Sequence, residues 1–513
     1  MTKLIKFTPF LLAVSPVIFL YDQNKNEITN EVLWLPVFSV LLLAFIVFFA
    51  IRFFEKDLKK AILTASLIVV GLLYYGFIYD AIYNFKLGDL TLGRHKYLFP
   101  LWVLLLIGGL YWTKRTKKDL DNFLQALCFS AFIMVLMPAL GSVYYNLTKP
   151  DLKKPVNGDV KFNLEDNQKL NLTQPLPDIY YIVPDAYAGP KVLNKYLNFD
   201  NEEFYDGLEK KGFIIAQNSR SSYQNTYFSL SSTLNMEYIN YLGEILGKDS
   251  NDYNPIRQMI DNNRTLRQLK SAGYKYLHFD SDYTTFLGED PLAIETPTDV
   301  FARMLMKFTI LRPFGGRYGF KESAINDQLR NNVLKVFDSL EQSVFEDGPK
   351  FVFAHITSPH GPYVFNRNGE KVNGQIYNNI DNIEEMKYYL DQLIFVNSRL
   401  LVLVDKILAN SQTPPIIIIQ SDHGFYVPPE VLTDPNYSEI KFNIRTKNFS
   451  AYYLPNKCKS ALPQSMNTVN TFRFIFDQCF GADYGLLENK SYYFTNESKP
   501  YDLIEIDYSK DIF

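Results

Sequence analysis

Long, uncharged apolar runs in the first 148 residues constrain this chain more than any other feature. A helix that crosses a membrane needs about 20 largely apolar residues. Five segments approach or reach that length: residues 7–21, 32–51, 61–79, 97–113 and 122–148. We therefore expect residues 1–148 to form a transmembrane anchor of five helices in a lipid bilayer.

The first of these runs is the shortest, and a signal-peptide core is the alternative interpretation of it. A cleavage pattern of small residues does not follow the run, whereas the polar stretch 22–27 does. We therefore predict a true first span. Cleavage of this segment would leave the orientation of the other four spans unchanged.

Lysine and arginine residues outside the predicted spans indicate the orientation of the anchor. With five spans, the loops alternate between the two sides of the membrane. One side carries ten basic residues, and these are Lys3, Lys6, Arg52, Lys56, Lys59, Lys60, Lys114, Arg115, Lys117 and Lys118. The other side carries four, and these are Lys25, Lys86, Arg94 and Lys96. The positive-inside rule then predicts a multi-pass protein of the cell membrane with a cytoplasmic N-terminus and an extracytoplasmic C-terminal domain.

The sequence after residue 148 has the mixed composition of a soluble domain. A polar stretch over residues 149–175 is interpreted as a linker, and the domain itself is expected over residues 176–513. The net charge of −3 provides no large basic field, so nucleic acid is excluded as a partner. The cysteines fit no metal-finger spacing. We expect Cys458 and Cys479 to be separate thiols, with a disulfide between them as the alternative.

Short strand-like runs alternate with helical patterns along this domain. The clearest strands are residues 179–183, 274–279, 351–355 and 416–419, and a long helical pattern covers residues 383–408. Buried strands that alternate with helices form a mostly parallel sheet with helices on both faces. The predicted fold class is therefore a five-span helical membrane bundle followed by an α/β domain with a mostly parallel central sheet.

Polar side chains mark the ends of three of these strands. Asp185 comes shortly after the first strand, and His355 and His360 mark the end of another. Asp422 and His423 follow the run of isoleucines. Ligands of open α/β sheets bind beside the carboxyl ends of strands, so we expect some of these groups to meet. Carboxylates and an imidazole suit one divalent cation, Mn²⁺ or Mg²⁺, with Zn²⁺ as the alternative.

A nucleophile is expected in the hydroxyl-rich segment 224–232, whose pattern opens a helix. A hydroxyl at a helix N-terminus lies at the positive end of the helix dipole, where a phosphate also binds. The spacing leaves Thr226, Ser229 and Ser231 open as candidates. N-capping by Asn225 or Thr226 is the simpler role for this segment.

These motifs resemble the alkaline phosphatase superfamily in its sulfatase-like branch. The layout of five spans and an outer sulfatase-like domain is similar to that of lipoteichoic acid synthases and related phosphoglycerol and phosphoethanolamine transferases. In that family an acid after the first strand, a threonine and an Asp-His-Gly motif bind the metal. The resemblance assigns these roles to Asp185, Thr226, Asp422 and His423, and it makes Thr226 the nucleophile.

The resemblance also implies substrate contacts. A histidine in a Pro-His-x-Pro segment contacts the charged group of the substrate in this family, and His360 matches it as a catalytic and substrate-binding residue. The nearby His355 is a second substrate-binding candidate. Residues 445–455 resemble the later part of membrane members of the family, which adds Arg445 and Asn448 as candidates.

The chain departs from parts of the superfamily pattern. Position 226 is not cysteine and no Cys-x-Pro-x-Arg segment occurs, so the modified nucleophile that sulfatases make from cysteine is absent. His423 is the last histidine of the chain, which argues against a second zinc site of the kind that two-zinc phosphatases have. The synthases usually carry Glu where this chain has Asp185, and the shorter side chain bears on metal preference.

The implied function is transfer of a phospho head group from a phospholipid-like donor to an envelope glycan or glycolipid, through a phosphothreonine at Thr226. No predicted span carries a central charged residue, so the membrane half is interpreted as an anchor. Two alternatives remain: a sulfatase-like or phosphodiester hydrolase that uses the same site, and an inactive glycan-binding envelope protein. The joint presence of the metal-binding residues and a nucleophile favours an enzyme.

The charge asymmetry makes a direct prediction about topology. A reporter that is active only outside the cytoplasm, fused after Phe513, should be active, because an odd number of spans separates the two termini. The measurement is reporter activity in intact cells. Activity of a cytoplasm-only reporter at the same position would contradict the predicted orientation.

Overall fold

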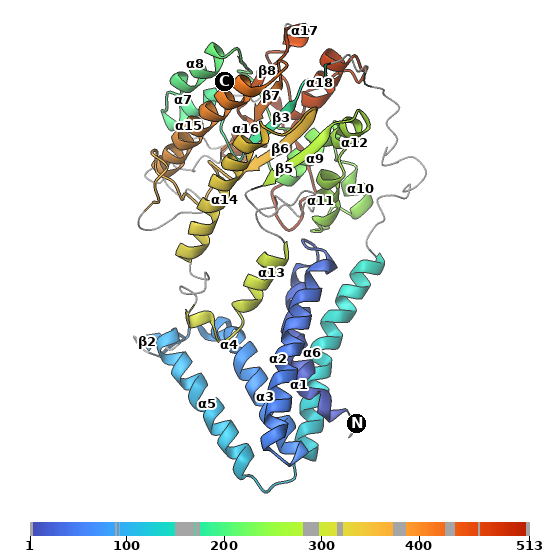
Figure 1. The fold of residues 1–513 in the computed structure, drawn as a ribbon, viewed down its shortest axis with the longest axis vertical. Coiled ribbons are helices and arrows are strands. Elements are labelled where there is room, and N and C mark those ends of the chain that lie inside the picture. Colours follow the sequence, from blue (N-terminus) through green and yellow to red (C-terminus); the bar gives the residue numbers. More distant parts are fainter. Residues whose placement is uncertain are drawn as a thin grey trace. The chain divides into compact units, whose positions relative to one another are not determined.

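The computed structural model divides the chain into two compact units (Figure 1). One unit comprises Met1–Lys149 and Thr296–Ile325, and the other comprises Pro150–Glu295 and Asn326–Phe513. The residues that the structure describes are 4–87, 90–91, 93–148, 170, 175–280, 297–314, 322–372, 386–425, 437–459 and 462–508. The linker predicted over residues 149–175 lies outside them, apart from residues 170 and 175.

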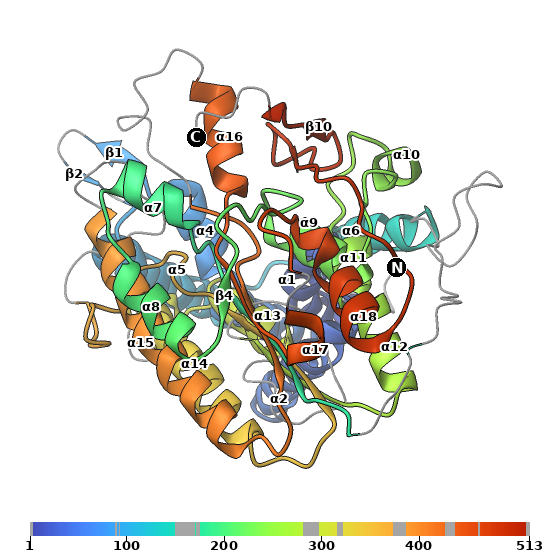
Figure 2. The ribbon, with the colours of Figure 1, turned by 90° about the horizontal axis from the view of Figure 1, so that it is seen from above.

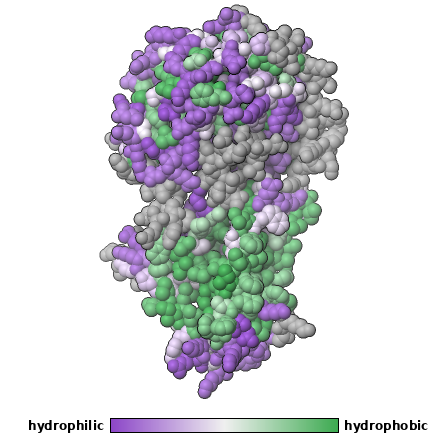
Figure 3. All heavy atoms as spheres, viewed as in Figure 1, coloured by the Kyte–Doolittle hydropathy of each residue, from purple (hydrophilic) through white to green (hydrophobic). Residues whose placement is uncertain are grey.

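The first unit is built from apolar helices. Among the described residues, four helices are long and apolar enough to cross a membrane, and a pair bent by 53° adds a fifth span if it is taken as one. The four are α1 (Thr8–Asn24, preceded by η1, Ile5–Phe7), α2 (Trp34–Phe54, preceded by η2, Asn30–Leu33), α5 (His95–Arg115) and α6 (Asp121–Thr148). The bent pair is α3 (Leu58–Leu73) and α4 (Tyr75–Ile82). Short elements complete the unit: β1 (Lys86–Leu87), β2 (Leu90–Thr91), α13 (Pro297–Met306) and η3 (Arg312–Phe314). Figure 3 shows the hydrophobic side chains, in green, that cover the outside of these helices.

The segment before α1 and two connecting loops lie at one end of the helical unit. Ile5, Ile62 and Leu124 belong to one buried cluster there. Lys59 forms an ion pair with Asp121 at 2.7 Å. The segments before α1, between α2 and α3, and between α5 and α6 therefore meet at one end, as alternating spans require. The basic residues predicted to face the cytoplasm belong to these segments.

Residues 297–314, which contain α13 and η3, pack on the break between α3 and α4. The Gly76 N–H donates to the Phe308 carbonyl and the Ile310 N–H donates to the Leu72 carbonyl, both at 2.7 Å. A helix break leaves backbone groups without helical partners, and apolar surroundings make that costly. This segment supplies those partners, so a part of the chain that is remote in sequence completes the bent span.

A side chain at position 76 should disrupt this contact. A Cβ built on Gly76 would meet the Lys307 carbonyl well inside van der Waals distance, whereas one built on Gly108 has nothing within 4 Å. Overpacking of this kind costs about 1–3 kcal/mol. We expect Gly76→Ala to lower the thermal unfolding temperature of the full chain in detergent. Gly108→Ala, the matched control, should leave it unchanged or raise it slightly, because alanine favours helix. Equal unfolding temperatures for the two variants would contradict the packing.

The second unit contains a six-stranded, mostly parallel sheet with the strand order β4-β8-β7-β3-β6-β5. The strands are β3 (Ile179–Pro184), β4 (Ile214–Ile215), β5 (Lys275–Asp280), β6 (Lys350–Ile356), β7 (Ile416–Gln420) and β8 (Ser450–Tyr453). β3 pairs in parallel with β6 and β7, and β5 pairs in parallel with β6. β8 is antiparallel to β7, and β4 is antiparallel to β8. The predicted sheet is confirmed, with an antiparallel edge that the sequence did not reveal.

Helices cover both faces of the sheet. Successive residues of a strand point to opposite faces. Accordingly, Tyr180 and Ile182 join one buried cluster, and Ile179, Tyr181 and Val183 join the other. The helices of the first face are α7 (Pro190–Leu197), α8 (Glu202–Lys210), α14 (Glu322–Ser343) and α15 (Met386–Asn410). The helices of the second face include α9 (Thr226–Asn235), α11 (Asn254–Asp261), α12 (Arg264–Ser271), α17 (Asn456–Lys459) and α18 (Thr471–Phe480). Figure 2 shows α14 and α15 on one side and α12 and α18 on the other.

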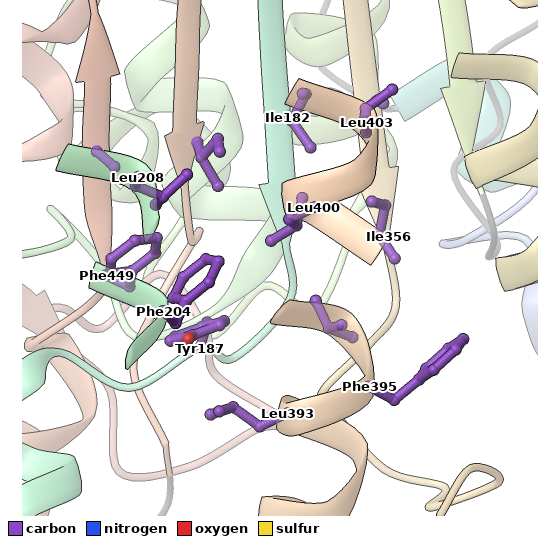
Figure 4. Packing of buried hydrophobic residues seen from close by; sticks show 14 of the residues in the cluster. Ile182, Tyr187, Phe204, Leu208, Ile356, Leu393, Phe395, Leu400, Leu403 and Phe449 are labelled. Atoms are coloured by element: carbon purple, nitrogen blue, oxygen red, sulfur yellow. The ribbon is translucent and has the colours of Figure 1, made fainter. Parts of the chain in front are cut away.

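The first of these layers is packed through aromatic rings. Tyr187, which follows β3, contacts Phe449 with ring centroids 4.7 Å apart, and Phe204 of α8 lies 5.7 Å from the same ring. Figure 4 shows these rings beside the leucines of α15. The remaining elements of the unit are short: α10 (Leu242–Leu246), α16 (Tyr437–Thr446), η6 (Thr468–Asn470), β9 (Tyr492–Tyr493) and β10 (Ile504–Glu505).

The structure pairs Cys458 with Cys479 in a disulfide whose Cα atoms lie 5.3 Å apart. The expectation of two separate thiols was therefore wrong. The 21-residue separation carries no signal in the sequence, and it is the packing of α17 against α18 that brings the two sulfurs together. Disulfides persist outside the cytoplasm, so this pair agrees with the side of the membrane that the charges predict.

Candidate active site

The polar groups at the carboxyl ends of β3 and β7 converge. Ile182 of β3 pairs with Ile419 of β7, so the residues that follow both strands lie side by side. Asp185, Asp422 and His423 offer potential ligand atoms that all lie within 4.8 Å of one another, and all three residues are buried. The His423 Nε2 lies 3.6 Å from the Asp185 Oδ1 and 3.3 Å from the Asp422 Oδ2.

Thr226 adds a hydroxyl to this cluster from α9, a helix of the second face of the sheet. It is the first residue of α9, where the Asn225 side chain caps the helix by accepting the Tyr227 N–H at 3.0 Å. The Thr226 Oγ1 lies 3.4 Å from the His423 Nε2. The hydroxyl therefore meets the carboxylates and the imidazole at the positive end of a helix.

The donor atoms fit a single divalent cation. The Asp185 Oδ1 and the Asp422 Oδ2 are buried without a hydrogen-bond partner. The His423 Nδ1 lies 2.9 Å from the Gly424 carbonyl, so it donates its proton there and directs the Nε2 lone pair at the carboxylates. The separations of 3.6 and 3.3 Å from the His423 Nε2 to the two carboxylates are short enough for all three groups to reach one ion.

The electrostatics of the cluster favour a cation. Burial and the neighbouring Asp422 raise the pKa of Asp185 to about 6, because two carboxylates share a space without water. Burial opposes ionisation of Asp422 as well, but the charged His355 and the Ala186 N–H outweigh it and lower the pKa of Asp422. Burial lowers the pKa of His423 to about 3, so this imidazole is neutral, as a metal ligand must be.

His355, predicted to bind substrate, lies inside β6 behind Asp185. Its Nδ1 is 3.3 Å from the Asp280 Oδ1 and its Nε2 is 3.6 Å from the Asp185 Oδ2. Burial alone would lower the pKa of His355, but Asp280 and then Asp185 raise it to about 10. This buried imidazolium compensates part of the negative charge of Asp185 and Asp280. The side chain is 3% exposed, so any substrate contact stays a prediction.

His360 lies at the rim of the cluster and is partly exposed. Its backbone N–H donates to the Asp185 carbonyl at 3.1 Å, and its ring centroid lies 6.4 Å from that of His423. Gln392 of α15 fixes this loop, because its Nε2 donates to the His360 carbonyl at 2.8 Å. Gln392 was not among the residues predicted from the sequence. The available signal was an amide on the apolar face of a long helix, which Asn397 shares.

Arg445 and Asn448 differ in their surroundings. The Arg445 Nε donates to the Gln224 carbonyl at 2.9 Å, and its charge lowers the pKa of Asp185, so it belongs to the neighbourhood of the cluster. Asn448 is fully buried; it accepts from the Ser219 hydroxyl at 2.9 Å and donates to the Ser421 carbonyl. Asn448 therefore fixes the loop before Asp422. Substrate binding by either residue stays a prediction.

Comparisons with known proteins give structural likeness at low sequence identity. No family model and no curated protein matches the chain. The C-terminal periplasmic domain of EcEptC from Escherichia coli is 14% identical with a TM-score of 0.43, over 68% of this chain and 96% of that one. The lipooligosaccharide phosphoethanolamine transferase A (EptA) of Neisseria meningitidis, an integral membrane protein, is 14% identical with a TM-score of 0.39, over 93% and 96%. A phosphonate monoester hydrolase of Agrobacterium radiobacter is 10% identical with a TM-score of 0.37, over 62% and 80%. Function does not follow from likeness at this level, and it is inferred from the site itself.

Metal binding can be measured as stabilisation. A cation at 100 times its dissociation constant stabilises the folded state by about 2.7 kcal/mol. We expect Mn²⁺ or Mg²⁺ to raise the thermal unfolding temperature of chelator-treated full chain, and Asp422→Asn to abolish that rise. Asp338→Asn, which changes an exposed carboxylate on α14, should keep it. An equal response in all three proteins would show that the cation binds elsewhere.

Proposed function

We propose that this chain is a metal-dependent transferase that moves a phospho head group from a phospholipid-like donor to an envelope glycan or glycolipid. The observation that carries the proposal is the convergence of a hydroxyl, Thr226, with Asp185, Asp422 and His423. These residues would hold one divalent cation, which supplies positive charge beside a phosphoryl group. A structural carboxylate cluster alone would not need a helix-terminal hydroxyl at the same point.

In the first step, the Thr226 Oγ attacks the donor phosphorus and forms a P–O bond. The bond from phosphorus to the diacylglycerol oxygen breaks, and this oxygen leaves with the bonding electrons. The Thr226 proton passes to water, and a cation held beside this hydroxyl would favour its loss. His360 at the rim supplies a proton to the leaving oxygen as general acid.

In the second step, an acceptor hydroxyl attacks the phosphothreonine, with His360 accepting its proton. The bond from phosphorus to the Thr226 Oγ breaks, this oxygen keeps the bonding electrons and takes up a proton from water, and the threonine is regenerated. The membrane anchor accounts for access to the lipid donor, since it holds the domain at the bilayer. The EcEptC domain is named as periplasmic. We propose an extracytoplasmic position for the present domain as well, which the basic loops and the Cys458–Cys479 disulfide support.

The nucleophile can be tested with neighbouring hydroxyls on one helix. We expect Thr226→Ala to lower transfer roughly 10³-fold or more and to abolish the phosphothreonine, because it removes the attacking oxygen. Ser231→Ala is the matched control, since its hydroxyl donates to the Ile256 carbonyl at 2.9 Å. Ser229 donates to the Asp422 carbonyl at 2.5 Å, and its alanine variant should retain substantial activity. The assay uses full chain in liposomes, head-group-labelled phospholipid and mass spectrometry of the protein. Full activity of Thr226→Ala with loss of activity in Ser229→Ala would identify Ser229, about one helical turn further along, as the nucleophile.

The same assay separates the other functional classes. Label that moves to an added glycan indicates a transferase. Label that is released as a soluble head group, with or without glycan, indicates a hydrolase with the same site. Absence of both reactions, with glycan still bound, indicates a binding protein and overturns the proposal.

A further inference from the structure

The α/β unit contains a polar cavity of about 460 Å³. Its lining does not include the residues of the candidate metal site, and the proposed reaction does not use it. Its volume lies within the range of about 300–1,000 Å³ that is typical of ligand pockets. Residues from six separate segments line it, and those that bear on its chemistry are Lys191, Asn218, Arg220, Lys447, Asn489 and Tyr508.

Strand directions place this cavity on the same edge of the sheet as Asp422. Ser450, the first residue of β8, pairs with Gln420, the last residue of β7, because the two strands are antiparallel. Lys447 precedes β8 and therefore lies at that edge. Residues 217–220 follow β4, which is antiparallel to β8, and reach the same edge.

The cavity and the candidate metal site share a wall. Ser219 lines the cavity, and its hydroxyl donates to the Asn448 Oδ1 at 2.9 Å. The Asn448 Nδ2 in turn donates to the carbonyl of Ser421, the residue before Asp422. A single buried amide therefore separates the two sites.

The lining combines positive charge with sugar-binding groups. Lys191, Arg220 and Lys447 bring positive charge, and the Arg220 guanidinium also donates to the Asn443 side chain at 2.8 Å. The positive end of α7 lies at the cavity, where Pro190 has no N–H and the Gly189 and Val192 N–H groups already donate to carbonyls. Asn218 carries an amide that can donate and accept, whereas the Asn489 amide is already bonded to Asn467 and Ser465. The described lining contains no Asp or Glu. Tyr508 adds an aromatic ring, with the Arg220 guanidinium 4.5 Å from its centroid.

We propose that this cavity binds an anionic saccharide, a sugar unit that carries a phosphate or carboxylate group. Cations and the helix N-terminus match the anionic group. Amides and hydroxyls match the sugar hydroxyls, and the tyrosine ring matches the apolar face of a pyranose. The role of the cavity as the binding site of the acceptor glycan rests on the proposed function. Binding of the sugar itself is independent of that function.

Binding to chelator-treated full chain in detergent tests the proposal without turnover. The probes are glucose 6-phosphate, glycerol 3-phosphate and inorganic phosphate, measured by titration calorimetry. We expect Lys191→Glu to weaken glucose 6-phosphate binding about tenfold or more, the size of one lost charge-assisted hydrogen bond. Lys195→Glu, on the same helix but outside the lining, should bind like the unchanged protein. Glutamate is favourable near a helix N-terminus, so Lys191→Glu should fold.

Each outcome bears on one part of the proposal. Asn218→Ala changes an exposed amide and should weaken the sugar phosphate without affecting inorganic phosphate. Glycerol 3-phosphate binding as tightly as glucose 6-phosphate would mark a lipid head-group site and overturn the saccharide. Equal affinity for inorganic phosphate, no binding at all, or no effect of Lys191→Glu would also overturn it. Head-group transfer by a protein that does not bind the sugar would contradict the saccharide site but not the proposed function. Sugar binding by a protein that shows no transfer would contradict the proposed function but not the saccharide site.

Discussion

Two buried carboxylates placed side by side are the constraint on which the rest of this site depends. Asp185 and Asp422 follow adjacent parallel strands whose register gives them no freedom to separate. Both are almost completely buried, and each has an oxygen without a hydrogen-bond partner. Such a pair is unfavourable unless positive charge lies nearby. The buried His355 imidazolium compensates part of it, and the spacing of the remaining donor atoms suits a cation.

The surrounding structure fixes these groups through backbone and amide contacts. Asn448 holds the loop before Asp422, and Gln392 holds the loop that carries His360. Neither amide belongs to the candidate metal site, yet each determines where a candidate site residue, Asp422 or His360, lies. Preorganised groups of this kind need no rearrangement during a reaction, which is how electrostatic stabilisation becomes effective. The polar cavity behind Asn448 shares the same edge of the sheet, so one strand arrangement positions both sites.

The helical unit shows a related dependence on remote contacts. Its spans follow from composition, because long apolar helices satisfy their own backbone hydrogen bonds in lipid. The bend between α3 and α4 does not satisfy them alone. Residues Phe308 and Ile310, more than 200 positions away, provide the missing partners. A segment between two parts of the α/β domain therefore belongs physically to the membrane anchor.

The sequence by itself determined the spans, the mostly parallel sheet and the strand-end residues, because apolar periodicity and local motifs are properties of neighbouring residues. It also singled out Asp185, Thr226, Asp422 and His423, through motif resemblance. Only the tertiary structure decided the Cys458–Cys479 disulfide, the antiparallel edge strands, the contact of His355 with Asp185, and the second cavity. Each of these depends on pairing between segments far apart in the chain. Such pairing is set by strand register and by packing of the whole core, which leave no local pattern in the sequence.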